Sequence, residues 1–166
     1  MKTIYSLILF AAMIASCQKK NIEASLSQKN IDYTYMVEEE KLARDVYQLM
    51  YDTHQLRVFG NIKESEQRHI EMMQELLKTN AVNFSIDSQR GVFQHKELQT
   101  LYNTLVEKGL KSKKDALEVG LAIEEKDIKD LEEIIARTTN ENDKKILINL
   151  RDASERHKSA FTRNLN

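Results

Sequence analysis

The sequence predicts an all-α protein built as a four-helix bundle. Apolar residues recur at helical spacing from about residue 32 onward. The 166 residues include no proline, where an average chain of this length has roughly eight. The connection between the second and third long helices is also long enough to return along the roughly 30 Å of a twenty-residue helix. These observations predict a crossover between helices two and three, with a short extra helix inside it.

The first two long helices follow from their apolar faces. The first is expected over residues 32–54, with the face Met36, Glu40, Ala43, Tyr47 and Met50. The second is expected over residues 61–80, with the face Ile62, Glu66, His69, Met73 and Leu76. Asn61 followed by Glu64 has the spacing of a capping box, which predicts that the second helix begins there.

The crossover and the last two helices are also predicted by apolar faces and capping residues in the sequence. Residues 81–93 show no periodicity, and a short helix is expected over 95–108 with Leu98, Leu101, Tyr102 and Leu105. Ser112 and Asp115 are expected to cap the third long helix, with the face Leu117, Leu121, Glu124, Ile128, Leu131 and Ile135. Thr139 or Asn140 is expected to open the fourth, with the face Leu147, Leu150, Ser154, His157 and Phe161.

Every long helix carries a possible metal ligand in the middle of its apolar face. The residues are Glu40, Glu66, His69, Glu124 and His157. Burying a carboxylate without a partner costs several kcal/mol, and a metal ion would supply the missing partner. We therefore predict these five residues as metal ligands. Glu39 is an alternative to Glu40, Glu125 to Glu124, and Asp127 flanks the same face. Solvated glutamates and satisfied core histidines are the alternatives without a metal.

Three segments, "EKLARDVY" at 40–47, "EQRH" at 66–69 and "GLAIEEKDIKDL" at 120–131, resemble the ferritin-like superfamily, in particular its rubrerythrin type. Together with "SERHKSAF" near the C-terminus they also resemble an uncharacterised ferritin-like domain-of-unknown-function branch. This resemblance implies an iron cofactor of one or two ions, with manganese or zinc as alternatives, and oxygen or peroxide as a small substrate. It implies a ferroxidase- or peroxidase-type oxidoreductase, in which Tyr47 is the candidate catalytic residue. A core tyrosine without a catalytic role is the alternative.

One residue departs from the pattern of the resembling family. Where its fourth helix has a second Glu-x-x-His, this chain has Ser154 three residues before His157. Glu40, Glu66 and Glu124 supply only three negative charges, which fits one divalent metal, or two with an added anion. Glu155 is a poor substitute, because it lies about 100° round the helix from Ser154.

The N-terminal segment has the layout of a secretory signal. Lys2 precedes an apolar run over residues 4–14 and small residues before Cys17, and "IASC" resembles the lipobox of bacterial lipoproteins. We therefore expect a signal peptide over 1–16, lipidation of Cys17, a flexible tether over 17–31 and a bundle domain over 32–166. The protein would then be anchored through its lipid to a membrane of the cell envelope, on the extracytoplasmic side.

Charge and cysteine content narrow the possible functions. The formal net charge is −1 and the isoelectric point is near 6.4, so no basic surface for nucleic acid is expected. The single cysteine excludes a disulfide within the chain and a thiolate iron site of the kind that supplies electrons in rubrerythrins. A homodimer is compatible with the sequence. The alternative to an enzyme is a non-catalytic envelope lipoprotein that binds metal or a partner through a degenerate bundle.

Overall fold

The computed structural model describes residues 28–29 and 32–166 of the chain. The predicted signal peptide and the lipidation site Cys17 lie outside the described residues. All regular secondary structure in the described part is helical. No helix among the described residues has the length and apolar character needed to cross a membrane.

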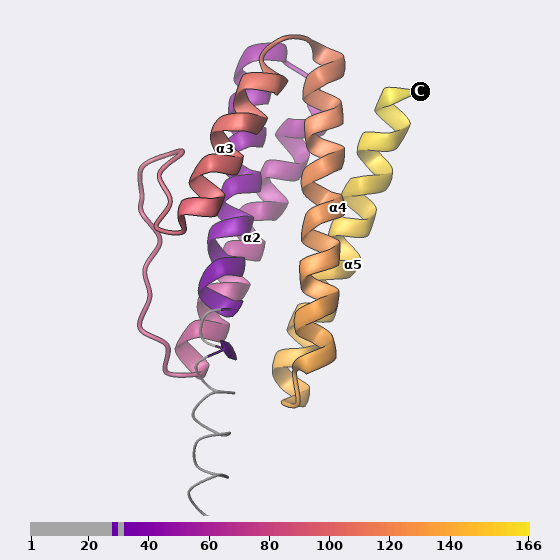
Figure 1. The fold of residues 1–166 in the computed structure, drawn as a ribbon. Coiled ribbons are helices and arrows are strands. Elements are labelled where there is room, and N and C mark those ends of the chain that lie inside the picture. Colours follow the sequence, from indigo (N-terminus) through magenta and orange to yellow (C-terminus); the bar gives the residue numbers. More distant parts are fainter. Residues whose placement is uncertain (1–27, 30–31) are drawn as a thin grey trace, which may run out of the picture. The chain divides into compact units, whose positions relative to one another are not determined.

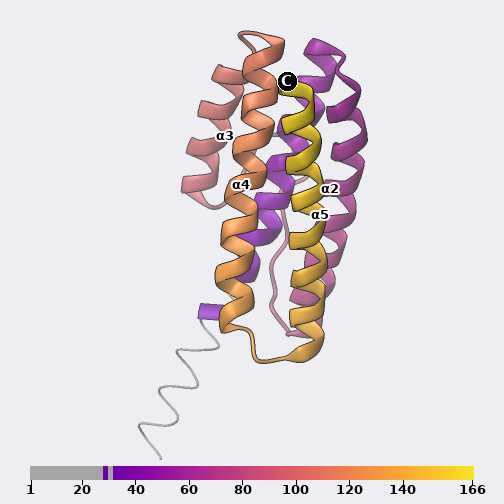
Figure 2. The same cartoon turned by 90° about the vertical axis from the view of Figure 1, so that its right-hand side faces the viewer.

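Four long helices form the bundle, which confirms the all-α prediction. They are the first helix over residues 32–54, α2 (Arg57–Thr79), α4 (Lys113–Arg137) and α5 (Glu141–Leu165). The shorter α3 (Lys96–Gly109) lies in the connection between α2 and α4, as expected. This connection returns the chain to the end at which α2 began, so that α2 and α4 run in the same direction (Figures 1 and 2). Among the labelled helices, α4 packs most extensively on α5.

The predicted start of the second helix at Asn61 is wrong. The helix α2 begins at Arg57, and its N-cap Leu56 makes no side-chain capping hydrogen bond. Phe59, which is fully buried, explains the difference. Its ring lies 5.2 Å from that of Phe161 and 5.7 Å from that of Tyr47, measured between centroids. Tertiary packing of this first turn therefore outweighs the local capping signal.

The starts of the last two long helices agree with their predicted caps. The Ser112 hydroxyl accepts a hydrogen bond from the Asp115 backbone N–H at 3.0 Å. The Asn140 side chain accepts from the backbone N–H groups of Asn142 and Asp143. Each cap satisfies donors that the first turn of a helix leaves without partners.

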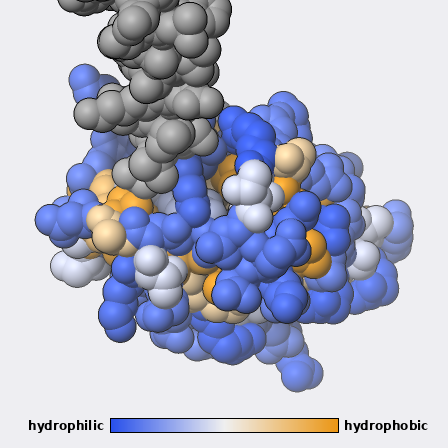
Figure 3. Space-filling view, turned by 90° about the horizontal axis from the view of Figure 1, so that it is seen from below, coloured by the Kyte–Doolittle hydropathy of each residue, from blue (hydrophilic) through white to orange (hydrophobic). Residues whose placement is uncertain are grey.

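The core consists of two apolar halves with a polar layer between them. Along the first helix, Glu40 lies between Val37 of one apolar cluster and Leu42 of the other. Along α2, α4 and α5 the buried polar residues likewise lie between members of the two clusters. The outer surface differs from this core in its polarity. At the end of the bundle viewed in Figure 3, the visible surface is mostly hydrophilic and hydrophobic residues form only small areas.

Candidate metal centre

The five predicted ligands come together in the polar layer. Glu40, Glu66, His69 and Glu124 are buried, and the side chain of His157 is 12% exposed. Their ligand atoms form two groups, each with all atoms within 4.8 Å of one another. One group contains Glu40, Glu66 and His69, and the other contains Glu66, Glu124 and His157. The first helix, α2, α4 and α5 thus together supply one site.

Glu66 is the residue that both groups share. Its Oε2 lies 2.8 Å from Nδ1 of His69, and its Oε1 lies 2.9 Å from Nδ1 of His157. Nδ1 of His69 is also 3.2 Å from Oε2 of Glu40, and Nδ1 of His157 is 3.6 Å from Oε2 of Glu124. The imidazole rings of the two histidines stack with their centroids 5.5 Å apart. Each oxygen of Glu66 therefore faces a different histidine.

Several buried atoms in the layer have no hydrogen-bond partner. They are Oε1 of Glu40, Oε1 of Glu66, Oδ1 of Asp127 and Nδ1 of His157. The last of these atoms forms an ion-pair contact of 2.9 Å with Oε1 of Glu66 and has no hydrogen-bond partner. Buried polar atoms are nearly always satisfied in native proteins, so several unsatisfied atoms at one place indicate a missing partner. All four are atoms that bind metal ions, and the residues present therefore fit a metal.

The pKa values show how strongly these groups affect one another. Burial, followed by repulsion from Glu66, raises the pKa of Glu124 to about 7. Burial also raises the pKa of Glu40 to about 7, although His69 opposes the shift. Burial alone would raise the pKa of Glu66, but the imidazoles of His157 and His69 hold it at about 2. Burial opposes the charged imidazoles as well, yet the neighbouring carboxylates raise the pKa of His69 to about 11 and that of His157 to about 9.

Asp127 adds a fourth carboxylate to the layer. The sequence placed it only beside the apolar face of its helix, but it is 4% exposed and lies one turn after Glu124 on α4. Burial, then repulsion from Glu40, raises its pKa well above the usual range, and the Ser154 side chain partly offsets this shift. The Ser154 hydroxyl itself donates to the Leu150 carbonyl at 3.2 Å. Asp127 of α4 thus lies beside Ser154, the position at which α5 lacks a carboxylate.

Tyr47 contacts the layer through its hydroxyl group. The hydroxyl donates to Oε1 of Glu124 at 2.7 Å, and the Gly120 carbonyl lies 3.4 Å from it. Burial, then the charge of Glu124, raises the pKa of Tyr47 well above its usual range. The tyrosine therefore stays protonated and holds one ligand in position. Its predicted catalytic role remains a prediction.

The structure distinguishes the alternative ligands from the predicted ones. Glu125 has a side chain that is 55% exposed, and Glu155 is exposed as well, so both lie outside the layer. Glu39 is 2% exposed, but one of its oxygens binds Nζ of Lys126 at 2.6 Å. Glu40 and Glu124 are therefore the members of these pairs that lie within reach of the histidines.

The acidic run 38–40 is buried throughout, which the sequence did not indicate. Glu38 accepts hydrogen bonds from the backbone N–H groups of Gln94 and His95 and contacts the His95 ring, each at 2.8 Å. Lys41 contacts Asp45 at 2.6 Å and donates to two carbonyls of the crossover segment. The partners in the crossover segment lie some fifty residues further along the chain. Helical periodicity carries no information about contacts at such a separation.

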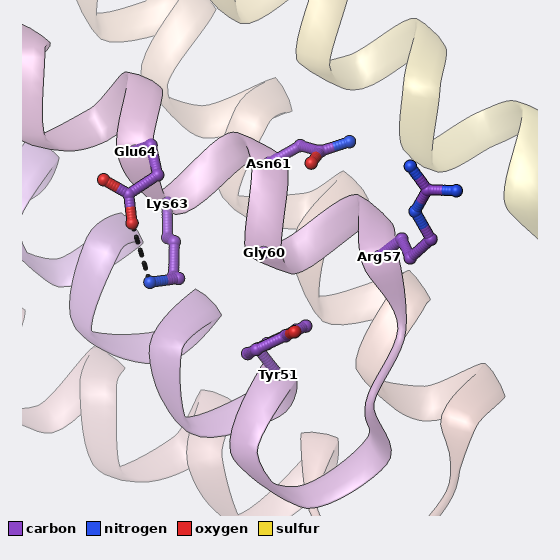
Figure 4. A pocket seen from close by; sticks show the side chains of 6 residues that line it. All are labelled: Tyr51, Arg57, Gly60, Asn61, Lys63 and Glu64. Carbon is purple, nitrogen blue, oxygen red and sulfur yellow. Dashed lines mark hydrogen bonds and ion pairs between the residues drawn. The ribbon is translucent and has the colours of Figure 1, made fainter.

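A surface pocket of about 310 Å³ lies at the corner between the first helix and α2 (Figure 4). It is lined by Tyr51, Arg57, Gly60, Asn61, Lys63 and Glu64. Lys63 is paired with Glu64 at 2.8 Å, and none of the predicted ligands lines the pocket. The predicted ligands therefore lie in the polar layer and not in this pocket.

Comparison with known proteins gives a family without an assigned activity. Residues 30–166 match the model of an "Uncharacterized protein domain (DUF2202)". The chain is 48% identical over 132 residues to the uncharacterized protein MJ0754 of Methanocaldococcus jannaschii, covering 79% of this chain and 71% of that protein. It is also similar to the crystal structure of hypothetical protein MJ0754 from Methanococcus jannaschii, with a TM-score of 0.81 and 44% identity. That match covers 82% of this chain and 79% of the other.

Proposed function

This chain belongs to the DUF2202 family, and we propose that its polar layer binds two divalent metal ions. The observation that carries the proposal is the set of unpartnered ligand atoms between the two apolar clusters. A metal ion would satisfy these atoms and neutralise the carboxylates to which they belong. Within the described residues the imidazoles of His69 and His157 face Glu66, but Oε1 of Glu40 and Oδ1 of Asp127 have no hydrogen-bond partner.

The charge of the site supports two ions rather than one. The sequence alone suggested three carboxylates, which fits one divalent ion more closely than two. Asp127 raises the number to four, together with Glu40, Glu66 and Glu124. Four negative charges balance two divalent cations when both histidines are neutral. Ser154 therefore does not leave the site one charge short, because the carboxylate comes from α4.

The two ligand groups suggest how the protein would divide the ions. Glu40 and His69 would hold one ion, Glu124 and His157 the other, and Glu66 would contact both because it belongs to both groups. Asp127 belongs to neither ligand group, but it interacts electrostatically with both Glu40 and Glu124, so its charge would help to neutralise both ions. Tyr47 would keep Glu124 oriented through its hydrogen bond.

We further propose redox chemistry with oxygen or a peroxide. Mixed carboxylate and imidazole ligands suit iron or manganese, and zinc also binds such sites. Two ferrous ions would supply one electron each, which with two protons reduces a hydroperoxide to an alcohol and water. The protein contributes a buried site that excludes bulk water, two imidazoles as ligands through Nδ1, and Tyr47 as a hydrogen-bond donor to Glu124.

The ferritin-like ancestry and the envelope location are part of the same proposal. The four-helix arrangement with its crossover is compatible with a ferritin-like bundle. Lipidation of Cys17 would anchor it, and replacement of Cys17 by serine should then release the protein from the membrane fraction. Retention of the Cys17→Ser protein in membranes would count against the lipid anchor.

The function can be tested by following ferrous iron bound to the purified protein without oxygen. We expect two equivalents of iron to raise the melting temperature by several degrees. Addition of one equivalent of hydrogen peroxide should then oxidise both ions faster than free ferrous iron under the same conditions. Unchanged melting would contradict metal binding. Tight binding without accelerated oxidation would favour the non-catalytic alternative.

A further inference from the structure

The turn of α2 that precedes His69 contacts both nitrogens of the His69 ring. Glu66, three residues before His69, places its Oε2 2.8 Å from Nδ1. Ser65, four residues before His69, places its hydroxyl oxygen 3.4 Å from Nε2. Residues three and four apart are neighbours on the surface of a helix, so the helical geometry of α2 brings both groups to the ring. His69 is thus held at both nitrogens by its own helix.

The two nitrogens of this ring have different surroundings. Nδ1 belongs to the ligand group that includes Glu40 and Glu66, whereas Nε2 contacts the neutral hydroxyl of Ser65. A neutral imidazole carries one proton, and the nitrogen that binds a metal ion cannot keep it. With a metal ion on Nδ1 the proton is therefore on Nε2, where the Ser65 hydroxyl accepts its hydrogen bond. This contact favours the tautomer and the ring orientation in which Nδ1 is available to a metal ion.

His157 on α5 has no counterpart of Ser65 in its own helix. The residues three and four before it are Ser154 and Ala153. The Ser154 hydroxyl donates to the Leu150 carbonyl, and the Ala153 side chain has no polar atom. The His157 side chain is also more exposed, at 12% against 5% for His69. The two ligand groups therefore differ in how firmly their imidazoles are oriented.

We propose that Ser65 is a positioning residue of the metal centre, which orients His69 and so tightens the binding of the ion that His69 and Glu40 hold. The inference rests on the proposed function, because it requires that the polar layer binds metal. Ser65 acts through the imidazole ring and is not itself a ligand. Its hydrogen bond is long, at 3.4 Å. The loss of this bond should therefore lower the affinity for the ion about tenfold, at the lower end of the effect that partners of metal-binding histidines have.

Titration of the purified metal-free chain with cobalt(II) measures this affinity, because the visible absorption of bound cobalt depends on its ligands. Ser65→Ala should weaken one binding step about tenfold and leave the other nearly unchanged. Ser65→Thr keeps a hydroxyl at the same position and should restore the affinity. Ser159→Ala removes an exposed hydroxyl of α5 two residues after His157 and should change neither step. Alanine forms helices better than serine, so the chelated Ser65→Ala protein should melt no lower than the wild type, which separates a loss of affinity from a loss of folding.

Proton NMR of the cobalt-loaded protein provides a signature that a purely structural role would not change. The paramagnetic ion separates the Nε2–H signal of a bound histidine from the rest of the spectrum, so that exchange of this proton with water can be followed. We expect one slowly exchanging Nε2–H in the wild type and in Ser65→Thr, and fast exchange of the same proton in Ser65→Ala. Equal cobalt affinity in the wild type and Ser65→Ala, or a Ser65→Thr protein as weak as Ser65→Ala, would overturn the inference while metal binding would stand. A wild-type chain that binds no cobalt would contradict the proposed function itself, and with it the role of Ser65.

Discussion

The first helix carries two sets of buried charges that differ in how they are satisfied. The first set binds the crossover segment and consists of Glu38, Lys41 and Asp45. Each of these residues has hydrogen-bond partners in that segment. Glu40 points into the bundle, where one of its oxygens has no partner. Both sets are buried to the same extent. Burial of charge therefore does not by itself distinguish a candidate site, and the unpartnered buried atoms are the feature that sets the polar layer apart.

The crossover contacts should dominate stability. Lys41→Met removes an ammonium group that holds Asp45 and two carbonyls, and it leaves Asp45 with fewer partners in a buried position. We expect the free energy of unfolding to fall by about 3–5 kcal/mol, measured by urea denaturation. Metal stoichiometry in the folded protein should not change. Lys114→Met, at a side chain that is 78% exposed, should leave both quantities unaltered. A loss of metal from folded Lys41→Met would mean that the two sets are not independent.

The metal-free protein should become less stable as the pH rises from 5 to 8. Glu40 and Glu124 have folded pKa values raised to about 7, so their contribution is present below about pH 4.5 and is lost as the pH rises through 7. The raised pKa values of His69 and His157 also lower the stability of the metal-free protein as the pH rises above 6.5. Glu66, with a pKa near 2, contributes constantly over this range and loses its contribution only in acid.

Together these shifts should lower the free energy of unfolding of the chelated protein by several kcal/mol between pH 5 and pH 8. The metal-loaded protein should lose less, because the ions replace the protons. Thermal melts at several pH values, with chelator and with metal, measure both curves. Parallel curves would show that metal does not bind these titrating groups.

Replacement of Asp127 should change the stability of the metal-free protein and that of the metal-loaded protein in opposite directions. Asp127→Asn removes a buried carboxyl whose ionisation is unfavourable, so at pH 8 the chelated protein should gain about 1 kcal/mol. The metal-loaded protein should lose stability, because one of its four carboxylates is missing. Asp130→Asn, at the partly exposed residue one turn later on α4, is the matched control. Destabilisation of the chelated protein by Asp127→Asn would indicate a structural role instead.

Removal of the Tyr47 hydroxyl should have the smallest effect. Tyr47→Phe keeps the aromatic contacts with Phe59 and Phe161 and loses the hydrogen bond to Glu124. We expect a cost of about 1 kcal/mol in the free energy of unfolding. The rate of iron oxidation by peroxide should fall without a change in the number of bound ions. An unchanged rate would remove Tyr47 from the proposed chemistry.

The sequence predicted the features of the fold and site that depend on local helical periodicity. It did not predict the features that depend on contacts between residues far apart in the chain. The helical faces correctly brought Glu66, His69 and Glu124 into the core, and the caps at Ser112 and Asn140 were confirmed. The start of α2 was wrong because Phe59 packs against residues from other helices. The burial of Glu38 was missed because its partners lie in the crossover segment. Asp127 had a usable signal in its spacing of three from Glu124, but its burial depends on the packing of α5.

The number of metal ions per chain tests the central claim most directly. Equilibrium dialysis of the purified protein against ferrous iron or manganese without oxygen, followed by elemental analysis, gives this number. We predict two ions per wild-type chain, one in Asp127→Asn and two in the control Asp130→Asn. A wild-type protein that retains one ion, with the same value in Asp127→Asn, would show that Asp127 does not complete the site. A wild-type protein that retains none would contradict a metal centre in the polar layer.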